Sequence, residues 1–388
     1  MRNFLAIPLL FFLFLPLKAQ ALVSWAISNP KGEIIDSCNA DIPMVPASIL
    51  KIPTALYALH HLGEDHVFSL GWYADEAGNL VISGSGDPLL TSLPLKSMVE
   101  GLAGQTPRRK FKGLVVDTSG FSAESLHVDG ASRNSIRTYD APLSPFSVNF
   151  NSIHFKTVDG KIISGEEETP FLPMAEEIAR KSGQKSGRIS MPHGDDFSIR
   201  YAAALARHFL EEAGFSFDLD DVRIRKEKPE QKDTLLFLAP SPFTLADVIR
   251  QLMQYSNNFL ANQLLLATVL EERKKTPLTM EDARLELEKF LKNTLGISDF
   301  ILEEASGISR KNRISAREML KAVQAFSPYM ELLRKEDDGE GWYKTGTLSN
   351  VRTRAGFFRG KDGWYAYVLM TADENHKYEG LLKKIREK

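Results

Sequence analysis

The sequence predicts an α+β fold: an antiparallel sheet flanked by helices, with a β-rich domain inserted into it. Strand-like runs occur near both ends of the chain, at 22–36 and 342–370, and a strongly helical stretch at 244–293 precedes the second group. Between them, from about residue 85 to 231, short strand-like runs alternate with turns. We therefore expect the first and last strands to pair in one sheet.

The N-terminal half of the chain contains a predicted hairpin and helix, followed by a turn-rich region. Leu22–Ile27 and Glu33–Asp36 flank the turn Asn29–Gly32 and predict the hairpin. A helix is expected at Thr54–Leu62, ending at Gly63. Beyond the turn at Gly84–Pro88, strands are expected at Gly113–Val116, Ser147–Ile153, Ile153–Thr157 and Arg188–Met191, and a helix at Arg200–Glu212.

After a charged stretch, Arg223–Asp233, the pattern becomes helical and then returns to strands. Thr244 and Asp247 form a capping-box-like helix start, and Thr279 with Asp282 forms another. The expected elements are helices from Thr244, at Phe259–Glu272 and at Thr279–Asn293, strands at Trp342–Leu348, Ala355–Arg359 and Trp364–Met370, and a last helix from Tyr378.

These elements predict a discontinuous domain made of residues 22–84 and 232–388. Residues 85–231 would then be the inserted β-rich domain. Residues 1–21 are interpreted as a cleaved secretory signal, because Arg2 precedes an apolar run, Phe4–Leu17, shorter than the roughly 20 residues that span a bilayer. The protein is therefore expected to be exported to the periplasm, with at most peripheral membrane association; an uncleaved anchor is the alternative.

Composition is that of a globular protein and excludes some functions. The 388 residues are 43% hydrophobic and 25% charged, with a formal net charge of −2. No basic field favours nucleic acid as a partner. A single cysteine, Cys38, cannot form an internal disulfide, so stability must come from a packed core.

Ser48 and Lys51 have the spacing of a nucleophile and its base at the start of an apolar helix. There the free backbone N–H groups favour negative charge, and the N–H of Ser48 would stabilise an oxyanion. Pro53 fits only if the regular helix begins near it, so Ser48–Lys51 is expected to form a tight first turn. The alternative role for Ser48 is a simple helix N-cap.

Two further motifs complete a set of groups for acyl transfer. A lysine acts as a base only when neutral, and burial near a second cation, Lys344, would lower the pKa of Lys51. Gly346 would let a substrate backbone approach, and Thr345 and Thr347 offer hydroxyls to a carboxylate. Ser256, between the two lysines, would relay a proton, and Asn258 would bind an amide carbonyl or merely cap a helix.

None of these patterns is specific by itself. Ser182-Gly183-Gln184-Lys185 repeats the Ser-x-x-Lys spacing, but it lies in a Gly/Ser/Lys-rich loop without an apolar face to support it. His60, His61 and His66 do not form a convincing metal site, so no metal or organic cofactor is expected. Ser306-Gly307 lacks the surrounding Gly-x-Ser-x-Gly pattern and is interpreted as a structural loop.

Taken together, the motifs resemble those of the D-alanyl-D-alanine carboxypeptidases and endopeptidases of the penicillin-binding protein 4 type. The segments that agree in order are 46–51, 54–56, 62–63, 84–88, 142–151, 305–316 and 344–348. The resemblance covers nearly all of the chain after the signal. It implies a penicillin-recognising transpeptidase-like domain at 22–84 and 232–388, and it implies that 142–151 forms a strand of the inserted domain.

The resemblance also implies the activity. Ser48 would attack the carbonyl between two D-alanines, or a D-centred crosslink, of a peptidoglycan stem peptide, and water would hydrolyse the acyl-enzyme. β-Lactams would acylate the same serine. The family usually has Ser-Asp-Asn where this chain has Ser256-Asn257-Asn258. A β-lactamase or esterase of the same fold, and a non-catalytic wall-binding homologue, remain alternatives.

Overall fold

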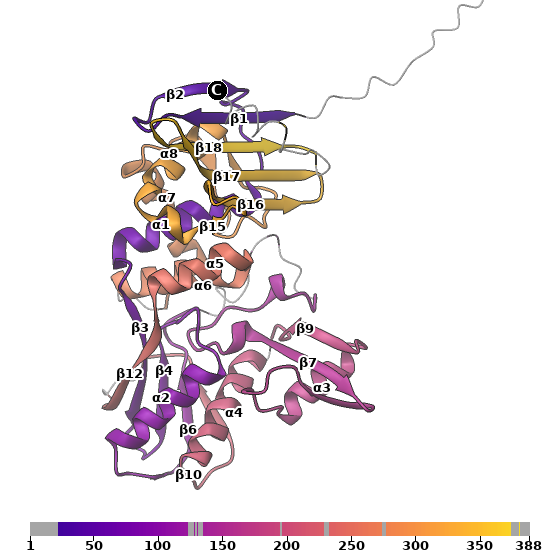
Figure 1. Cartoon of the computed structure of the whole chain (residues 1–388). Helices are drawn as coiled ribbons and strands as arrows, with labels where there is room; N and C mark the ends of the chain where they lie inside the picture. Colours follow the sequence, from indigo (N-terminus) through magenta and orange to yellow (C-terminus); the bar gives the residue numbers. More distant parts are fainter. Residues whose placement is uncertain are drawn as a thin grey trace, which may run out of the picture.

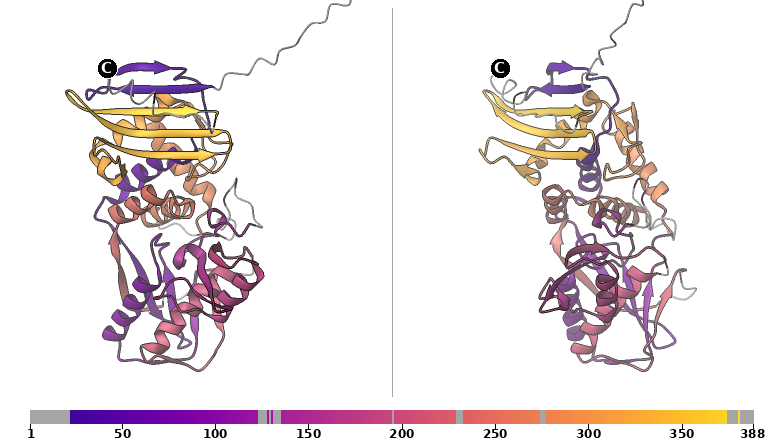
Figure 2. Two further views of the ribbon diagram at one scale, coloured as in Figure 1. Left: turned by 45° about the vertical axis from the view of Figure 1, so that its right-hand side comes forward. Right: turned by 90° about the vertical axis from the view of Figure 1, so that its right-hand side faces the viewer.

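The computed structural model describes residues 22–122, 128, 130, 135–194, 196–228, 233–273, 277–373 and 380, which form two lobes (Figures 1 and 2). The expected signal at 1–21 and, apart from Gly380, the expected helix from Tyr378 lie outside these residues. None of the helices in the described ranges combines the length and the apolar character that crossing a bilayer requires.

The upper lobe in Figure 1 contains a six-stranded antiparallel sheet. Its order is β15 (Arg334–Lys335), β16 (Gly341–Leu348), β17 (Val351–Gly360), β18 (Gly363–Thr371), β1 (Val23–Ser28) and β2 (Ile34–Cys38). Val23 pairs with Thr371 and Ser28 with Ala366, so the two ends of the chain lie side by side. This confirms the predicted N-terminal hairpin and its pairing with the last strands.

Five helices, which lie against this sheet and between it and the lower lobe, form the larger apolar core (Figure 1). They are α1 (Lys51–Leu62), α5 (Leu245–Tyr255), α6 (Asn258–Arg273), α7 (Met280–Asn293) and α8 (Ala316–Ala325). Both capping boxes are present, at Thr244 with Asp247 and at Thr279 with Asp282. The sequence patterns did not predict α8, whose N-cap Ser315 accepts a hydrogen bond from the Glu318 amide.

The lower lobe contains a five-stranded sheet that takes strands from both sides of the expected domain boundaries. Its order is β11 (Val222–Arg225), β6 (Leu114–Asp117), β4 (Leu80–Gly84), β3 (Val67–Ala74) and β12 (Thr234–Thr244). Thus β3, β4 and β12, which were assigned to the discontinuous domain, join one sheet with β6 and β11 from the expected insertion. The α2 helix (Ser92–Gln105) packs against β12 and against α4 (Phe197–Glu212).

A smaller layer completes the lower lobe, and the α+β fold class is confirmed. It is a three-stranded antiparallel sheet of β8 (Lys161–Ser164), β7 (Ser152–Val158) and β9 (Ser186–Ser190), with α3 (Pro173–Lys181) packed beside it. Short parallel strands β5 (Lys110–Phe111) and β10 (Ser216–Phe217) pair at the far end. Elsewhere, β13 (Phe300–Ile301) pairs with β14 (Arg313–Ile314).

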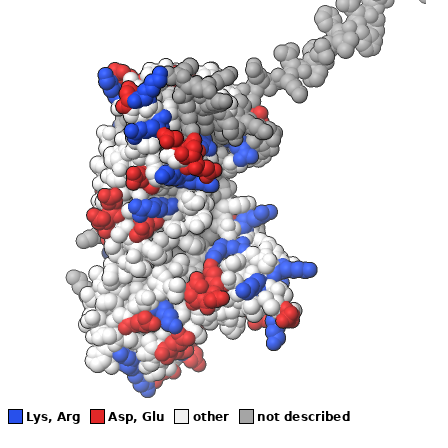
Figure 3. Space-filling model, in the orientation of Figure 1, with Lys and Arg blue, Asp and Glu red and all other residues white. Residues whose placement is uncertain are grey.

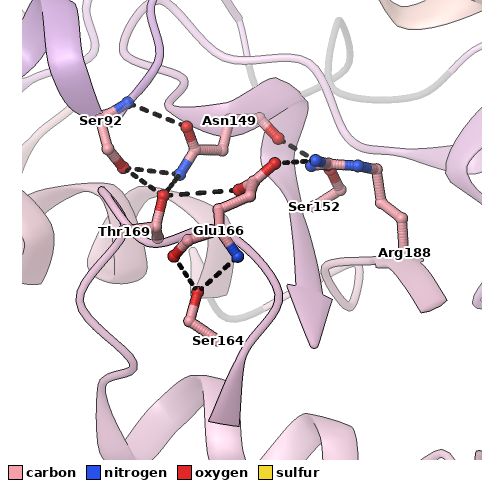
Figure 4. Close-up of polar contacts among 7 residues, drawn as sticks. All are labelled: Ser92, Asn149, Ser152, Ser164, Glu166, Thr169 and Arg188. Atoms are coloured by element: carbon pink, nitrogen blue, oxygen red, sulfur yellow. Dashed lines mark hydrogen bonds and ion pairs between the residues drawn. The ribbon is translucent and has the colours of Figure 1, made fainter. Parts of the chain in front are cut away.

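The strand expected at Ser147–Ile153, including the one implied for 142–151, is wrong. Asn149, Phe150 and Asn151 have φ values of 54°, 60° and 46°, a left-handed turn incompatible with a strand. The Asn149 side chain holds this turn: its Oδ1 accepts from the Ser92 amide and its Nδ2 donates to Ser92 Oγ. Figure 4 shows the polar network around it, which ties the start of α2 to the three-stranded sheet through Ser92, Asn149, Ser152, Ser164, Glu166, Thr169 and Arg188.

Replacement of Asn149 is expected to destabilise the lower lobe. In Asn149→Gly the left-handed turn remains accessible but the buried Ser92 amide loses its acceptor, which costs about 1–3 kcal/mol. Asn149→Ala adds roughly 1–2 kcal/mol of backbone strain. Urea unfolding of the two variants measures both effects. Equal stability of both variants and the unmodified protein would show that the network does not hold this turn.

Candidate active site

Ser48 and Lys51 lie in one continuous turn at the start of α1. Ser48 belongs to a 3₁₀ turn, Ala47–Leu50, and α1 begins directly after it at Lys51, with Pro53 in its first turn. This confirms the predicted tight turn. No side-chain capping bond from Ser48 to a backbone amide of this turn is present. Instead, Lys51 Nζ lies 3.0 Å from Ser48 Oγ.

Lys51 is fully buried, and its Nζ lies within hydrogen-bond distance of three oxygen atoms from different parts of the chain. Besides Ser48 Oγ, its Nζ donates to Asn258 Oδ1 and to the Ser306 carbonyl oxygen, both at 2.7 Å. Burial lowers the pKa of Lys51 well below its ordinary value, and the positive charge of Lys344 lowers it further, while Glu304 opposes the shift. The structure therefore favours the neutral amine that a base requires.

Ser256 and Asn258 occupy the short link between α5 and α6. Ser256 has a φ of 54°, and its Oγ accepts from Lys344 Nζ at 2.7 Å. Asn258 lies at the start of α6 and contacts Lys51 directly. Asn257, where the family usually has Asp, uses its Oδ1 to accept from the Leu260 amide at 3.2 Å, so it still caps α6.

The β16 strand brings Lys344 beside Ser256 and Gly346 beside the Ser48 turn. Lys344 is 2% exposed, and burial lowers its pKa to about 7. A Cβ added at Gly346 would lie 2.7 Å from the Ser48 amide nitrogen and 2.2 Å from Thr353 Oγ1. Only glycine therefore allows β16 to lie this close to the Ser48 turn.

A cavity of about 630 Å³ opens beside Ser48. Its walls include Asn258 and Thr347 from the expected site, with Gly130, Tyr139, Gly307, Ile308, Ser309, Arg310, Lys311 and Leu348. Thr347 is exposed, and its hydroxyl accepts from the Arg352 guanidinium at 2.8 Å. Thr345 is exposed on the same strand but does not line this cavity. Of the two threonines, Thr347 is therefore the better placed to contact a molecule in the cavity.

Two groups at the site were not expected. The first is the Ser306 carbonyl, which contacts Lys51; the second is the carboxylate of Glu304, which is completely buried behind it. Ser306-Gly307 was interpreted as a structural loop, and residues 305–316 were used only as one of the segments that resemble the family. Nothing in the local pattern indicated that Glu304 is buried, because glutamate is usually exposed.

On the face drawn in Figure 3, basic and acidic side chains alternate over both lobes without an extended field of one sign. This agrees with the formal net charge of −2.

The two-lobed α+β fold and the contact between Ser48 Oγ and the buried Lys51 amine are the features expected of a serine-type acyl-transfer enzyme. A family model described as the D-Ala-D-Ala carboxypeptidase 3 (S13) family matches residues 19–196 and 195–333. The chain belongs to this family, and it is a D-Ala-D-Ala carboxypeptidase of the penicillin-binding protein 4 type.

Individual relatives agree with this assignment. The chain is 23% identical to the D-alanyl-D-alanine carboxypeptidase DacB of Haemophilus influenzae, over 76% of this chain and 68% of that protein. It is 22% identical to a D-alanyl-D-alanine carboxypeptidase of Actinomadura sp. (strain R39), over 89% of this chain and 76% of the relative. The fold matches that of penicillin binding protein 4 (dacB) from Haemophilus influenzae with a TM-score of 0.75 and 21% identity, over 95% of both chains.

Proposed function

We propose that the protein cleaves D-Ala-D-Ala ends or D-centred crosslinks of peptidoglycan stem peptides through an acyl-enzyme on Ser48. The observation that carries this proposal is the fully buried Lys51 amine at 3.0 Å from Ser48 Oγ, with its pKa well below the ordinary value. Lys51 accepts the Ser48 proton as Oγ attacks the peptide carbonyl. Water then hydrolyses the ester and releases the shortened peptide.

The remaining site residues have distinct proposed roles. The backbone N–H groups of Ser48 and Thr347 hold the oxyanion, and the loss of one such donor typically costs about 2.7–4 kcal/mol of barrier. Ser256 and Lys344, joined by a 2.7 Å hydrogen bond, pass a proton to the leaving amine. Asn258 binds the substrate amide, Thr345 and Thr347 receive the terminal carboxylate, and Gly346 lets the substrate backbone approach.

We propose that β-lactams acylate Ser48, because they present a strained amide beside a carboxylate. A solved complex of the Haemophilus influenzae penicillin binding protein 4 with a novel β-lactam, of similar fold, supports this proposal. Export to the periplasm through a signal at residues 1–21 would place the enzyme beside the cell wall.

We also propose that the chain is divided into a peptidase domain, residues 22–84 and 232–388, and an inserted domain, residues 85–231. Membership of β3, β4 and β12 in the lower sheet supports boundaries nearer to residues 66 and 245. With either division, Gly130 and Tyr139 from the inserted region line the cavity beside Ser48. The insertion would therefore contact the substrate.

Digestion of crosslinked and uncrosslinked muropeptides side by side tests the proposed function. Release of D-alanine from the uncrosslinked peptide identifies carboxypeptidase activity, and loss of dimers identifies endopeptidase activity. Binding of muropeptides without release of either product would favour a non-catalytic wall-binding protein. Rapid turnover of penicillin, in place of a long-lived adduct, would favour a β-lactamase.

The activity is expected to show a bell-shaped pH dependence. As pH falls, Lys51 gains a proton and ceases to act as a base; as pH rises through about 7, Lys344 loses its charge. The value of kcat/KM should therefore fall on both sides, with the alkaline limb near pH 7. Lys344→Arg keeps a cation at all pH values, so the alkaline limb should move to higher pH even if the variant's maximal rate is lower. An alkaline limb that stays in place in this variant would contradict the role of Lys344.

A further inference from the structure

The carboxylate of Glu304 is buried behind the site, and six neutral donors surround it. The residue is 0% exposed. Its two oxygens accept from the amides of Ser306 and Gly307 at 2.7 Å and of Ser309 at 3.3 Å, from Ser306 Oγ at 2.5 Å, from Asn312 Nδ2 at 2.9 Å and from Asn262 Nδ2 at 3.3 Å. A carboxylate is an acceptor-only group, so this donor shell suits its ionised form.

The loop that wraps around this carboxylate also holds the start of α1. The Ser306 carbonyl accepts from Lys51 Nζ at 2.7 Å, and the Ala305 carbonyl accepts from Thr54 Oγ1 at 2.8 Å. Gly307, with a φ of 84°, lies so close to the nucleophile turn that an added Cβ would be 1.9 Å from the Ala47 carbonyl oxygen. Glu304 therefore organises the backbone that touches both the base and the turn carrying Ser48.

We propose that Glu304 is a positioning residue of the reaction, which fixes the Ser306 carbonyl against Lys51 and supplies the buried negative charge that stabilises the Lys51 ammonium. That charge is needed when the Ser48 O–H bond breaks and the proton moves to the Lys51 amine, since the amine then becomes a buried cation. The inference rests on the proposed Ser48 acyl-enzyme mechanism.

The charges around Lys51 support this role. Among the residues that the structure describes, Lys344 on β16 lowers the pKa of Lys51 and Glu304, in the loop after β13, raises it. Arg310 and Lys311 line the cavity beyond Ser48 and add positive charge on that side. Without Glu304, the charge of Lys344 would act on the buried amine unopposed by this carboxylate, and the amine would be a weaker base.

The test measures acylation by a fluorescent penicillin as a function of pH in Glu304→Gln and Glu304→Asp. Glu304→Gln removes the charge at nearly constant shape. The acylation rate constant is expected to fall about 10- to 100-fold, and the acidic limb to move about one pH unit lower. Glu304→Asp retains the charge on a shorter side chain, so the rate should fall but the limb should stay where it is in the unmodified protein.

If Glu304→Gln does not fold, a second variant, in which the carboxylate is moved to a neighbouring residue, provides the test. Glu304→Gln combined with Asn312→Asp returns a carboxylate to the same buried cluster, and its acidic limb should match that of the unmodified protein. An unmoved limb in a folded Glu304→Gln, or a displaced limb in the double variant, would overturn the inference. Ser48→Ala separates the two hypotheses: if it still acylates, the proposed mechanism fails, and if it is inactive while Glu304→Gln is normal, only the inference fails.

Discussion

Ser48→Ala is expected to lose D-alanine release by at least about 10⁴-fold, because the variant lacks the atom that forms the acyl bond. Ser48 is partly buried. Within the described parts of the chain, its Oγ makes one hydrogen bond, with Lys51 Nζ. The fold should therefore persist, with little change in Tm. The measurement is D-alanine release from a peptide ending in D-Ala-D-Ala, at equal concentrations of folded protein.

Ser182→Ala is the matched control for this experiment. Ser182 has the same Ser-x-x-Lys spacing, but its Oγ donates to the Ala179 carbonyl at the end of α3, and Lys185 is exposed. Its activity should equal that of the unmodified protein. Activity that survives in Ser48→Ala and disappears in Ser182→Ala would place the nucleophile in the lower lobe and contradict the proposed site.

Lys51→Met is expected to lower the rate of Ser48 acylation about 10²- to 10⁴-fold, the usual contribution of a general base. Methionine fills the space of the buried apolar stem but cannot accept a proton. The measurement is the rate of adduct formation with a fluorescent penicillin, with circular dichroism to show that the variant is folded.

The exposed Lys185 provides the control for the loss of a lysine, as Lys185→Met. Its acylation rate should match that of the unmodified protein. If Lys51→Met acylates at the normal rate, another group must remove the Ser48 proton, and the buried Lys51 amine does not contribute to catalysis.

The parts of the fold that depend on short-range patterns could be predicted from the sequence. The capping boxes at Thr244 and Thr279 mark the starts of two helices, and Gly63, with a φ of 79°, ends α1 as expected. The first and last of the three C-terminal strands match the predicted ranges to within one residue at each end, whereas β17 begins four residues earlier than the predicted Ala355–Arg359. In these segments, side-chain periodicity and capping chemistry act within a few residues of each other.

Features decided by distant contacts could not be predicted. The apolar residues around Asn149 suggested a strand, but hydrogen bonds to Ser92, far away in the sequence, hold a left-handed turn there. Which sheet β3 and β12 join depends on pairing across more than a hundred residues. Likewise, Ser48, Lys51 and Lys344 could be proposed from motif order, whereas the contribution of Glu304 depends on a burial that local sequence does not show.

The most direct test of the Ser48–Lys51 mechanism is to locate the covalent adduct formed with a labelled penicillin. After reaction and proteolysis, mass spectrometry should find the label on the peptide containing Ser48, and Ser48→Ala should carry none. A label on a different residue, or equal labelling of the Ser48→Ala protein, would contradict the account.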